Sequence, residues 1–598
     1  MSLRGSSTER RHILTVNLED YFQVGHLSGV IPQKYWDRFE KRVEQSTLAT
    51  LDLLDKHNAK ATFFTVGWLA DQARDIVAEV SRRGHEIASK GYLHRSIGQM
   101  SPKEFRRDAV RSRVALERAC CQEVLGYRIA RGWYTKADLW ALDILAEEGF
   151  VYDSSVRPFG RIKELSRQDQ VLHSHSTKGG EIWILPISSW WSCGFSLPIS
   201  GGNYMRQLPH RLIRNRVEAW HRSIGSPLIL YFHVWELDPA QPRVSAAPWL
   251  DQMRHYRNLD GMRARVDYYL SRYRMVSACD FLGLPREPVS VQPDHTEATA
   301  PPISFSTDRK DVTVVVPCFN EVSSIPFLKR SIEVFETQYR HKYNIHLIFV
   351  DDGSSDDTLE HLSSTFGAWN KCDIIRHDRN RGVAAATLTG VRNARTDVVC
   401  VIDCDCSYDI GHLARLIPLL GSDVDLVTAS PYHKEGNVLN VPRWRITLSR
   451  GASVLYRIVL STKLATYTAC FRVYRRSAIV DLEISNGGFL GITEILALLD
   501  QRGSRIVECA TVLEPRLFGQ SKMKVVLAII GHLRLLAKIG LRRGLARENR
   551  SGPRKPVPLR RDPPSAWWFG GTRPGRMVPG GTKGCEWRAR EGTNGWQR

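Results

Sequence analysis

Long apolar segments are missing from this 598-residue sequence. No window reaches the roughly 18–20 uninterrupted apolar residues that a membrane-spanning helix needs, and the best candidate, Val525 to Ile539, is broken by His532, Arg534 and Lys538. The first sixteen residues also lack the apolar stretch that follows the charges of a secretory signal. We therefore expect a cytoplasmic protein that associates peripherally with the inner (cytoplasmic) membrane.

Regular cysteine spacings and a compact basic and aromatic array are also missing. The 12 cysteines form no disulfide framework, so we expect reduced thiols. The formal net charge of +21 permits an anionic partner, such as an anionic membrane surface or an anionic substrate. Much of the excess charge lies at 206–222 and 534–561, without the interleaved aromatics of a base-stacking surface. We therefore predict no nucleic-acid partner.

Composition divides the chain into four parts. Residues 287–308 are rich in proline, serine and threonine without an apolar period, which predicts an interdomain linker. In residues 1–286, short apolar runs alternate with helical patterns, which predicts an α/β domain. In residues 309–545, three apolar strands separated by helices predict a second α/β domain with a parallel sheet. Residues 546–598 are dominated by glycine, proline, arginine and tryptophan, which predicts a disordered basic tail.

Carboxylates follow all three strand-like runs of the second domain. Glu321 comes after the first run, Asp352 ends the second, and Asp403 and Asp405 end the third. The ends of parallel strands meet at one crevice, where carboxylates can hydrogen-bond a nucleobase and a ribose. Asp403 and Asp405 lie on the same side of an extended chain, so they can chelate a hard divalent ion such as Mg²⁺ or Mn²⁺. Such an ion would neutralise a diphosphate leaving group.

Cationic and hydroxyl side chains follow later in the second domain. Arg472, Arg516 and Lys522 can clamp phosphates, with the Ser521 hydroxyl beside them. Glu494 is a candidate catalytic base, although a glutamate on an apolar helix serves equally well as a structural partner. A lipid phosphate is already ionised near neutral pH, so transfer to it needs alignment and leaving-group stabilisation more than a strong base.

These segments of the second domain resemble the polyprenyl-phosphate branch of inverting family 2 glycosyltransferases. The resemblance rests on P-x-[YF]-N-E at 317–321, V-D-D-G-S-x-D-x-T at 350–358, D-x-D at 403–405 and R-x-x-G-x-S-K at 516–522. It implies a nucleotide-binding, Rossmann-like fold of the GT-A type. It also implies a nucleotide-sugar site at Pro317, Glu321 and Asp352, a metal and catalytic site at Asp403 and Asp405, and an acceptor-phosphate site at Arg472, Arg516, Ser521 and Lys522. The Q-x-x-R-W motif of processive synthases is absent from the sequence, which favours transfer of a single sugar.

Four short motifs occur in order through the first domain. They are VNLEDYF at 16–22, GHEIASKGYLH at 84–94, GYR at 126–128 and FHVWE at 232–236. These motifs resemble those of the NodB-homology polysaccharide deacetylases, which have a (β/α) barrel fold and act as metal-dependent hydrolases of C–N bonds. The resemblance implies Glu19, Asp20 and His94 as ligands of zinc or another divalent metal, with His233 and Arg128 as catalytic residues.

Two residues of the first domain depart from the deacetylase pattern. Asn17 stands where the family has an aspartate that acts as base, and Lys90 stands at the first of two metal-binding histidines. Asparagine cannot accept a proton, and a protonated lysine repels a metal ion. We therefore expect impaired or lost hydrolysis, with an active site of rearranged ligands as the alternative.

The two resemblances together predict a fusion protein. We expect its second domain to move one sugar from a nucleotide-sugar donor to a polyprenyl phosphate at the inner face of the membrane. The stretch from Lys522 to Arg543 either lies on the anionic leaflet or packs on the transferase domain as an ordinary amphipathic helix. Two alternatives stay open: a bifunctional enzyme that deacetylates a chitooligosaccharide or polysaccharide and acts on the glycan chain, or a non-enzymatic glycan-binding scaffold in the first domain.

Overall fold

The computed structural model describes residues 10–156, 160–161, 170–192, 195–289, 309–519 and 525–548. The described residues up to Leu541 group into one compact unit. Within this unit, the described elements form two lobes, at 10–289 and at 309–541, and each is built on its own large sheet. Most of the predicted linker and of the predicted tail lies outside the described residues.

The first lobe is built on a largely parallel sheet with the strand order β11-β1-β2-β3-β4-β5-β8-β7. In addition β12 pairs with β1, and the β7–β8 pair is antiparallel. The strands are β1 (Arg11–Leu18), β2 (Thr62–Thr65), β3 (Glu86–Ser89), β4 (Gly126–Tyr127), β5 (Tyr152–Asp153), β7 (His173–Thr177), β8 (Gly180–Ile184), β11 (Ile229–His233) and β12 (Arg274–Val276). All four residues of β2 are buried, as expected for a strand whose sheet is covered on both faces.

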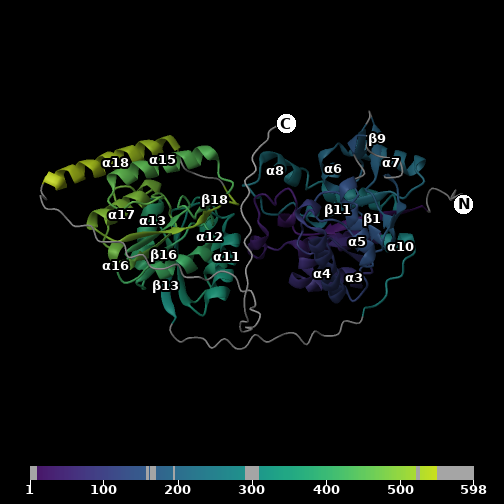
Figure 1. Cartoon of the computed structure of the whole chain (residues 1–598), viewed down its shortest axis with the longest axis horizontal. Coiled ribbons are helices and arrows are strands. Elements are labelled where there is room, and N and C mark those ends of the chain that lie inside the picture. The colour runs from purple at the N-terminus through teal and green to yellow at the C-terminus, as the bar shows by residue number, and fades with distance from the viewer. Residues whose placement is uncertain are drawn as a thin grey trace, which may run out of the picture. The chain divides into compact units, whose positions relative to one another are not determined.

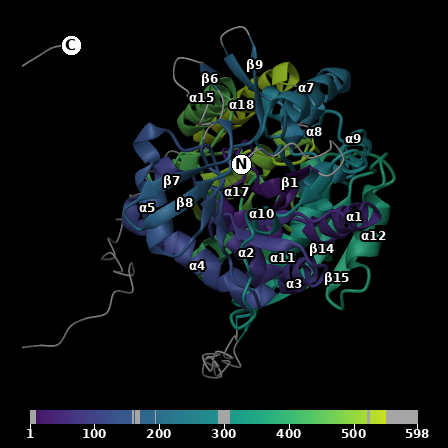
Figure 2. The same ribbon diagram turned by 90° about the vertical axis from the view of Figure 1, so that its right-hand side faces the viewer.

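Helices surround the strands of the first lobe. They include α1 (Val43–Lys56), α2 (Gly67–Gln72), α3 (Arg74–Arg82), α4 (Pro102–Cys120) and α5 (Trp140–Glu147), of which α3, α4 and α5 are seen outside the strands in Figure 2. Helix α4 begins at a capping box in which Ser101 and Glu104 satisfy each other's backbone N–H groups. A small sheet and five further helices complete the lobe: β6 (Gly160–Arg161), β9 (Ser189–Ser192), β10 (Phe195–Pro198), α6 (Gly202–Gln207), α7 (His210–Ser223), α8 (Trp249–Tyr256), α9 (Met262–Leu270) and α10 (Ala278–Leu282).

The second lobe is built on a seven-stranded sheet with the order β15-β14-β13-β16-β19-β17-β20. The strands are β13 (Lys310–Cys318), β14 (Tyr343–Asp351), β15 (Cys372–Arg376), β16 (Val398–Val401), β17 (Leu426–Ser430), β19 (Arg472–Arg475) and β20 (Ile506–Ala510). Strands β13 to β16 are parallel, whereas β19 runs antiparallel to both of its neighbours. The chain passes from β13 outward to β15 and then returns to β16 on the other side of β13. That reversal of strand order marks the crevice in which α/β sheets bind ligands.

Helices cover both faces of the second sheet. Along β13, Val314 and Val316 face one core and Val315 faces the other, as the two-residue period of a strand requires. Helices α11 (Ile325–Tyr339) and α12 (Thr358–Phe366) pack on the first face, and α13 (Val383–Asn393) and α17 (Phe489–Arg502) pack on the second. The predicted α/β class is thus confirmed in both lobes.

Two long helices form an outer layer on the second lobe. Helices α15 (Arg443–Val459) and α18 (Val525–Glu548) lie side by side outside α17 and α13 in Figure 1. The hydroxyl of Tyr456 on α15 lies 2.9 Å from His532 Nδ1 on α18. Among the described helices, none combines the length and hydrophobicity needed to cross a membrane. The lobe is completed by the pair β18 (Asn437–Val438) and β21 (Val512–Leu513) and by the short helices α14 (Leu413–Leu416) and α16 (Arg476–Ile479).

Candidate functional site

The paired aspartates of the second lobe follow β16 in the crevice. Asp403 is half-buried, and desolvation together with the charge of Asp405 raises the pKa of Asp403 to about 7. Asp405 Oδ1 accepts hydrogen bonds from the backbone N–H of Ser407, at 2.9 Å, and from the Ser407 hydroxyl. Two carboxylates this close together repel each other, and a bound cation would relieve that repulsion. No group of three or more candidate ligands occurs among the described residues, so diphosphate oxygens and water would have to complete the coordination of a Mg²⁺-like ion.

Arg516 links the first and third strand ends. Its Nη2 donates to Glu321 Oε2, its Nη1 lies 3.7 Å from Asp405 Oδ2, and its Nε donates to the Phe518 carbonyl at 2.7 Å. Glu321 is held in turn by the Ser324 hydroxyl at 3.1 Å. The structure therefore brings together three predicted site residues that are far apart in the sequence. Arg516 also places a positive charge beside the aspartate pair, where a diphosphate would lie if a metal were bound there.

Asp352 is engaged in holding a loop. Its Oδ1 lies 2.7 Å from His377 Nδ1 and accepts from Arg381 N at 2.8 Å, while its Oδ2 accepts from Gly382 N at 2.7 Å. Gly382, with φ of 94°, leads into α13. Asp352 thus orders this loop, and its contact with a nucleotide stays a prediction. Sequence reasoning missed the loop, although the polar run at 377–382 just before an alanine-rich helix was a usable signal.

Arg472 does not face an acceptor site. Its side chain is buried, and its guanidinium donates to the carbonyls of Ile492 and Tyr467 at 2.7 and 2.8 Å. It therefore ties β19 to α17 and to the preceding loop, which corrects the prediction that it binds the acceptor phosphate. Pro317 lies in β13, in register with Val350 of β14. Ser521 and Lys522 lie outside the described residues.

Glu494 acts as a structural partner of the loop before α17. One of its carboxylate oxygens, Oε2, accepts from the backbone N–H groups of Ser485 and Asn486, at 3.2 and 2.9 Å, and from the Asn486 amide at 2.8 Å. Its other oxygen lies 3.8 Å from Lys538 Nζ on α18. Of the two roles that the sequence left open, these contacts favour the structural one.

In the first lobe, Glu19 lies at the centre of a buried cluster. Its Oε2 accepts a hydrogen bond from the Lys90 ammonium, and its oxygens lie 2.8 Å from His94 Nε2 and 2.6 Å from His233 Nδ1. The side chains of Glu19, Lys90 and His94 are at most 3% exposed. Burial alone would raise the pKa of Glu19, but Lys90 and the two histidines outweigh it and hold that pKa well below its usual range. Lys90 thus supplies the positive charge that a metal ion would otherwise bring.

The other predicted deacetylase residues are engaged around this cluster. Asn17 Oδ1 accepts from Arg128 Nη1 at 3.0 Å, and Arg128 Nη2 donates to the Ser154 hydroxyl at 2.8 Å. Asp20 is turned to the start of α1, where its Oδ2 accepts from the backbone N–H groups of Arg42 and Val43 at 2.9 and 3.1 Å. Asp20 is therefore not a ligand beside Glu19, which corrects that prediction. The residues present do not fit a zinc site, because an ammonium group occupies its centre.

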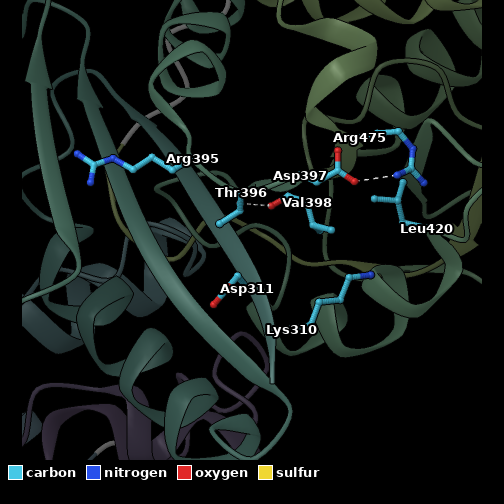
Figure 3. A pocket seen from close by; sticks show the side chains of 8 residues that line it. All are labelled: Lys310, Asp311, Arg395, Thr396, Asp397, Val398, Leu420 and Arg475. Carbon is cyan, nitrogen blue, oxygen red and sulfur yellow. Dashed lines mark hydrogen bonds and ion pairs between the residues drawn. The ribbon is translucent and has the colours of Figure 1, made fainter. Parts of the chain in front are cut away.

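A pocket of about 400 Å³ lies at the opposite end of the second sheet. Figure 3 shows its lining residues, Lys310, Asp311, Arg395, Thr396, Asp397, Val398, Leu420 and Arg475. Lys310 begins β13 and Val398 begins β16, so the pocket is at the amino ends of strands whose carboxyl ends carry the acidic motifs. It is not part of the candidate site.

Family models match three parts of this chain. The polysaccharide deacetylase model matches residues 35–147, a domain of unknown function (DUF3473) matches residues 154–282, and the glycosyl transferase family 2 model matches residues 313–482. A dolichol-phosphate mannosyltransferase of Pyrococcus furiosus is 28% identical over 218 residues, which are 36% of this chain and 59% of that protein. The chain thus spans less than two thirds of the length of that relative. An uncharacterized glycosyltransferase of Mycobacterium bovis is 32% identical over 214 residues, which are 36% of this chain and 89% of that protein.

Solved structures resemble each lobe at low identity. A crystal structure described as a polysaccharide deacetylase from Mycobacterium smegmatis covers 49% of this chain and 97% of its own, with 18% identity and a TM-score of 0.32. Glucosyl-3-phosphoglycerate synthase from Mycobacterium tuberculosis, in complex with Mn²⁺, UDP and glucosyl-3-phosphoglycerate, covers 37% of this chain and 76% of its own, with 18% identity and a TM-score of 0.28. On the family models and the Mycobacterium bovis relative, this chain belongs to glycosyl transferase family 2 through its second lobe, and its first lobe consists of a polysaccharide deacetylase (NodB-homology) domain followed by a DUF3473 domain.

Proposed function

We propose that the second lobe is an inverting transferase that moves one sugar from a nucleotide-sugar donor to a polyprenyl phosphate. The observation that supports this most is the half-buried pair Asp403 and Asp405, with the pKa of Asp403 raised to about 7 and Arg516 beside it. Mg²⁺ or Mn²⁺ held by the pair would neutralise the departing diphosphate. Arg516 would bind a phosphate oxygen with the fork geometry of its guanidinium.

The remaining residues of this site align the two substrates. Glu321 fixes the direction of Arg516, and Asp352 orders the loop that enters α13 beside the strand ends. Ser521 and Lys522 follow Arg516 in the sequence and would extend the phosphate contacts. No residue is required as a strong base, because a phosphate monoester nucleophile is already ionised, and alignment then supplies most of the rate.

The outer helix layer supports a lipid acceptor. Along α15, Trp444, Leu448, Leu455 and Ile458 recur at helical spacing and are 41–72% exposed. On α18, Leu535, Leu536 and Ile539 are buried against the lobe, while Ile529, Ile530, Leu533 and Leu541 are exposed. The helix therefore packs on the lobe and still presents an apolar surface, which supports the predicted contact with a membrane. The exposed arginines at 443, 450, 457 and 534 border this surface, as in helices that lie on anionic membranes.

The name of the Pyrococcus furiosus relative, a dolichol-phosphate mannosyltransferase, agrees with a polyprenyl-phosphate acceptor. A water-soluble glycan chain is the other candidate acceptor. Purified full-length protein should be incubated with Mn²⁺, a panel of radiolabelled nucleotide sugars and a membrane lipid extract. We expect label in the organic phase that mild acid releases, and none with the Asp405→Asn variant. Label that appears in a water-soluble glycan instead would contradict the lipid acceptor.

For the first lobe, we propose a domain without zinc-dependent hydrolysis. The supporting observation is the buried Lys90 ammonium on Glu19, together with Asn17 in place of a basic aspartate. The purified protein should contain less than stoichiometric zinc and should release no acetate from chitooligosaccharides. A full equivalent of zinc, lost on substitution of His94 by alanine, would overturn this assignment and favour the bifunctional deacetylase.

A further inference from the structure

A short segment of the first lobe contacts the two loops that carry Asp405 and Arg516. The segment is the 3₁₀ helix η2 (Gln33–Arg38) with Phe39, and it lies against α11 and the loops at 406–409 and 514–518. We propose that this segment positions the metal and phosphate residues of the transferase, so that the deacetylase-like lobe serves the transfer reaction without catalysing a step of its own. The inference rests on the proposed transferase function and deepens it.

Arg38 fixes the loop that follows the aspartate pair. Its Nη1 and Nη2 lie 2.9 and 3.1 Å from the two carboxylate oxygens of Asp409, and the two side chains are 12% and 17% exposed. Burial would raise the pKa of Asp409, but the Arg38 charge outweighs it and lowers that pKa. Asp409 Oδ1 also accepts from Gly411 N at 2.8 Å. A two-point pair of this kind fixes orientation as well as distance, so the loop that begins at Asp405 is anchored at its far end.

Tyr35 fixes the loop that carries Arg516. Its hydroxyl donates to Glu514 Oε1 at 2.6 Å, two residues before Arg516. The backbone N–H of Glu514 donates to the Ser407 carbonyl at 3.0 Å, so the two loops are also tied to each other. Farther along, the first-lobe residue Ser245 donates its N–H to the Leu517 carbonyl at 2.8 Å and its hydroxyl to the Gly519 carbonyl at 2.6 Å. Arg516 is therefore held on both sides by residues of the first lobe.

Three phenylalanines pack against one another at the same contact between the lobes. The ring centroid of Phe39 lies 5.0 Å from that of Phe327 on α11 and 5.9 Å from that of Phe518, and Phe327 lies 5.8 Å from Phe518. All three rings are at most 5% exposed. Phe327 is close in sequence to Glu321, and the Phe518 carbonyl accepts a hydrogen bond from Arg516 Nε. The aromatic cluster thus supports the same residues that the polar pairs align.

Precise placement is what this site needs from its surroundings. A metal held by only two protein carboxylates, next to a single arginine for the phosphate, tolerates an error of about 0.5 Å before affinity and rate fall. Asp405 and Arg516 both lie on loops, and loops are less rigid than strands. The contacts from Tyr35, Arg38 and Ser245 fix those loops, which makes these three residues positioning residues rather than catalytic ones.

The test compares Arg38→Ala, Arg38→Lys and Tyr35→Phe in the full-length chain. The matched control is Arg82→Ala, which removes an exposed arginine paired with Glu79 within the first lobe. We expect Arg38→Ala to lower kcat about tenfold and to raise the Mn²⁺ concentration for half-maximal activity severalfold, with the donor KM less changed. Arg38→Lys should recover part of the loss, and Tyr35→Phe should lose about threefold in kcat. Combining Arg38→Ala with Asp409→Ala should cost no more than either alone.

Binding of Mn²⁺ alone is measured without donor or acceptor, from the electron paramagnetic resonance signal of the free ion. It therefore reports on positioning even if the proposed acceptor is wrong. Weaker Mn²⁺ binding in Arg38→Ala, with an unchanged melting temperature in Tyr35→Phe, supports the inference. If all three variants keep kcat and Mn²⁺ affinity within twofold of wild type, the segment only joins the lobes and the inference is overturned.

Discussion

The two lobes each place acidic side chains at the carboxyl ends of their strands, but they balance the charge in opposite ways. In the second lobe Asp403 and Asp405 face one guanidinium, and the pKa of Asp403 rises to about 7. In the first lobe Glu19 contacts an ammonium and two imidazoles, and its pKa falls well below the usual range. The first arrangement needs an added cation, whereas the second already contains one.

This difference separates a proposed metal site from one whose cation is already supplied by lysine, within a single chain. A carboxylate pair with excess negative charge gains most from a divalent ion. A buried carboxylate that is already neutralised by lysine gains little, because the ion would have to displace the ammonium and desolvate it at the same time. The presence of a metal-binding family fold is therefore not enough to predict a metal; the local charge balance decides.

The largest effect is expected from removing the negative charge of Asp405 in the second lobe. Asp405→Asn should reduce sugar transfer on the order of 100-fold or more, because the departing diphosphate loses the ion that neutralises it. The measurement is the initial rate with purified protein at saturating Mn²⁺. Asp423→Asn, at an exposed aspartate paired with Arg505, is the control and should keep its rate. Full activity in Asp405→Asn would show that the two sites do not differ in the way described.

The second prediction converts the site occupied by lysine into a metal site. Lys90→His combined with Asn17→Asp should raise zinc from substoichiometric to about one per chain, because it removes the internal cation and adds a neutral nitrogen ligand. Zinc is measured by elemental analysis after dialysis, and acetate release from a chitooligosaccharide is followed in parallel. Asn17→Asp alone is the control and should bind no more zinc than wild type. Equal zinc content in wild type and the double variant would refute the role assigned to Lys90.

Much of the transferase site could be predicted from the sequence because strand ends of a parallel sheet converge. Glu321, Asp403 and Asp405 follow buried strands, and the rule that such ends share one crevice placed them together correctly. Arg516 was placed with them by its motif, and its contacts with Glu321 and Asp405 agree with that. Fold class followed from the alternation of apolar strands and helices.

Side-chain direction and long-range contacts could not be predicted in the same way. Arg472 was predicted to bind the acceptor phosphate, yet its side chain is buried in the core against α17. Asp20 stands next to Glu19 in the sequence, but its side chain caps the backbone at 42–43 instead of joining the cluster. The contacts of η2 with the 514–518 loop join residues more than 450 positions apart, and no local pattern encodes such a pair.

The third prediction compares the fully buried Asp153 with the half-buried Asp403, whose carboxyl groups have similar pKa values. Burial raises the pKa of Asp153 in the first lobe to about 7, as it does for Asp403, but the partner of Asp153 is Ser155, through its backbone N–H and its hydroxyl. Folded Asp153 holds its proton at pH values where the unfolded chain, with an aspartate pKa near 4, has lost it. The protonated Asp153 therefore stabilises the fold fully below about pH 4. This stabilisation, on the order of a few kcal/mol, is lost as pH rises to about 7.

Asp153→Asn removes that dependence, since an amide does not titrate in this range. The free energy of unfolding by urea, followed by tryptophan fluorescence at several pH values, should show wild type losing stability relative to the variant between about pH 4 and 7. Glu19 shifts stability in the opposite direction, because its pKa is lowered, but it is present in both proteins and cancels in the difference. A constant difference between wild type and variant across this range would contradict the raised pKa.

The smallest effect is expected at the surface, where the lobes also differ. The second lobe presents the apolar residues of α15 and α18 bordered by arginines, and basic residues near an anionic leaflet contribute about 1 kcal/mol each. Wild-type protein should therefore pellet with anionic vesicles at low salt and be released at high salt, where the Debye length falls to about 3 Å. Ile458→Glu, at a residue 72% exposed on α15, should weaken pelleting severalfold, because it removes apolar contact and adds a repelled charge. The matched control is Leu250→Glu on α8 of the first lobe, which is 56% exposed and should leave pelleting unchanged. Equal loss in both variants would show that charge alone, and not the face formed by α15 and α18, brings the protein to the membrane.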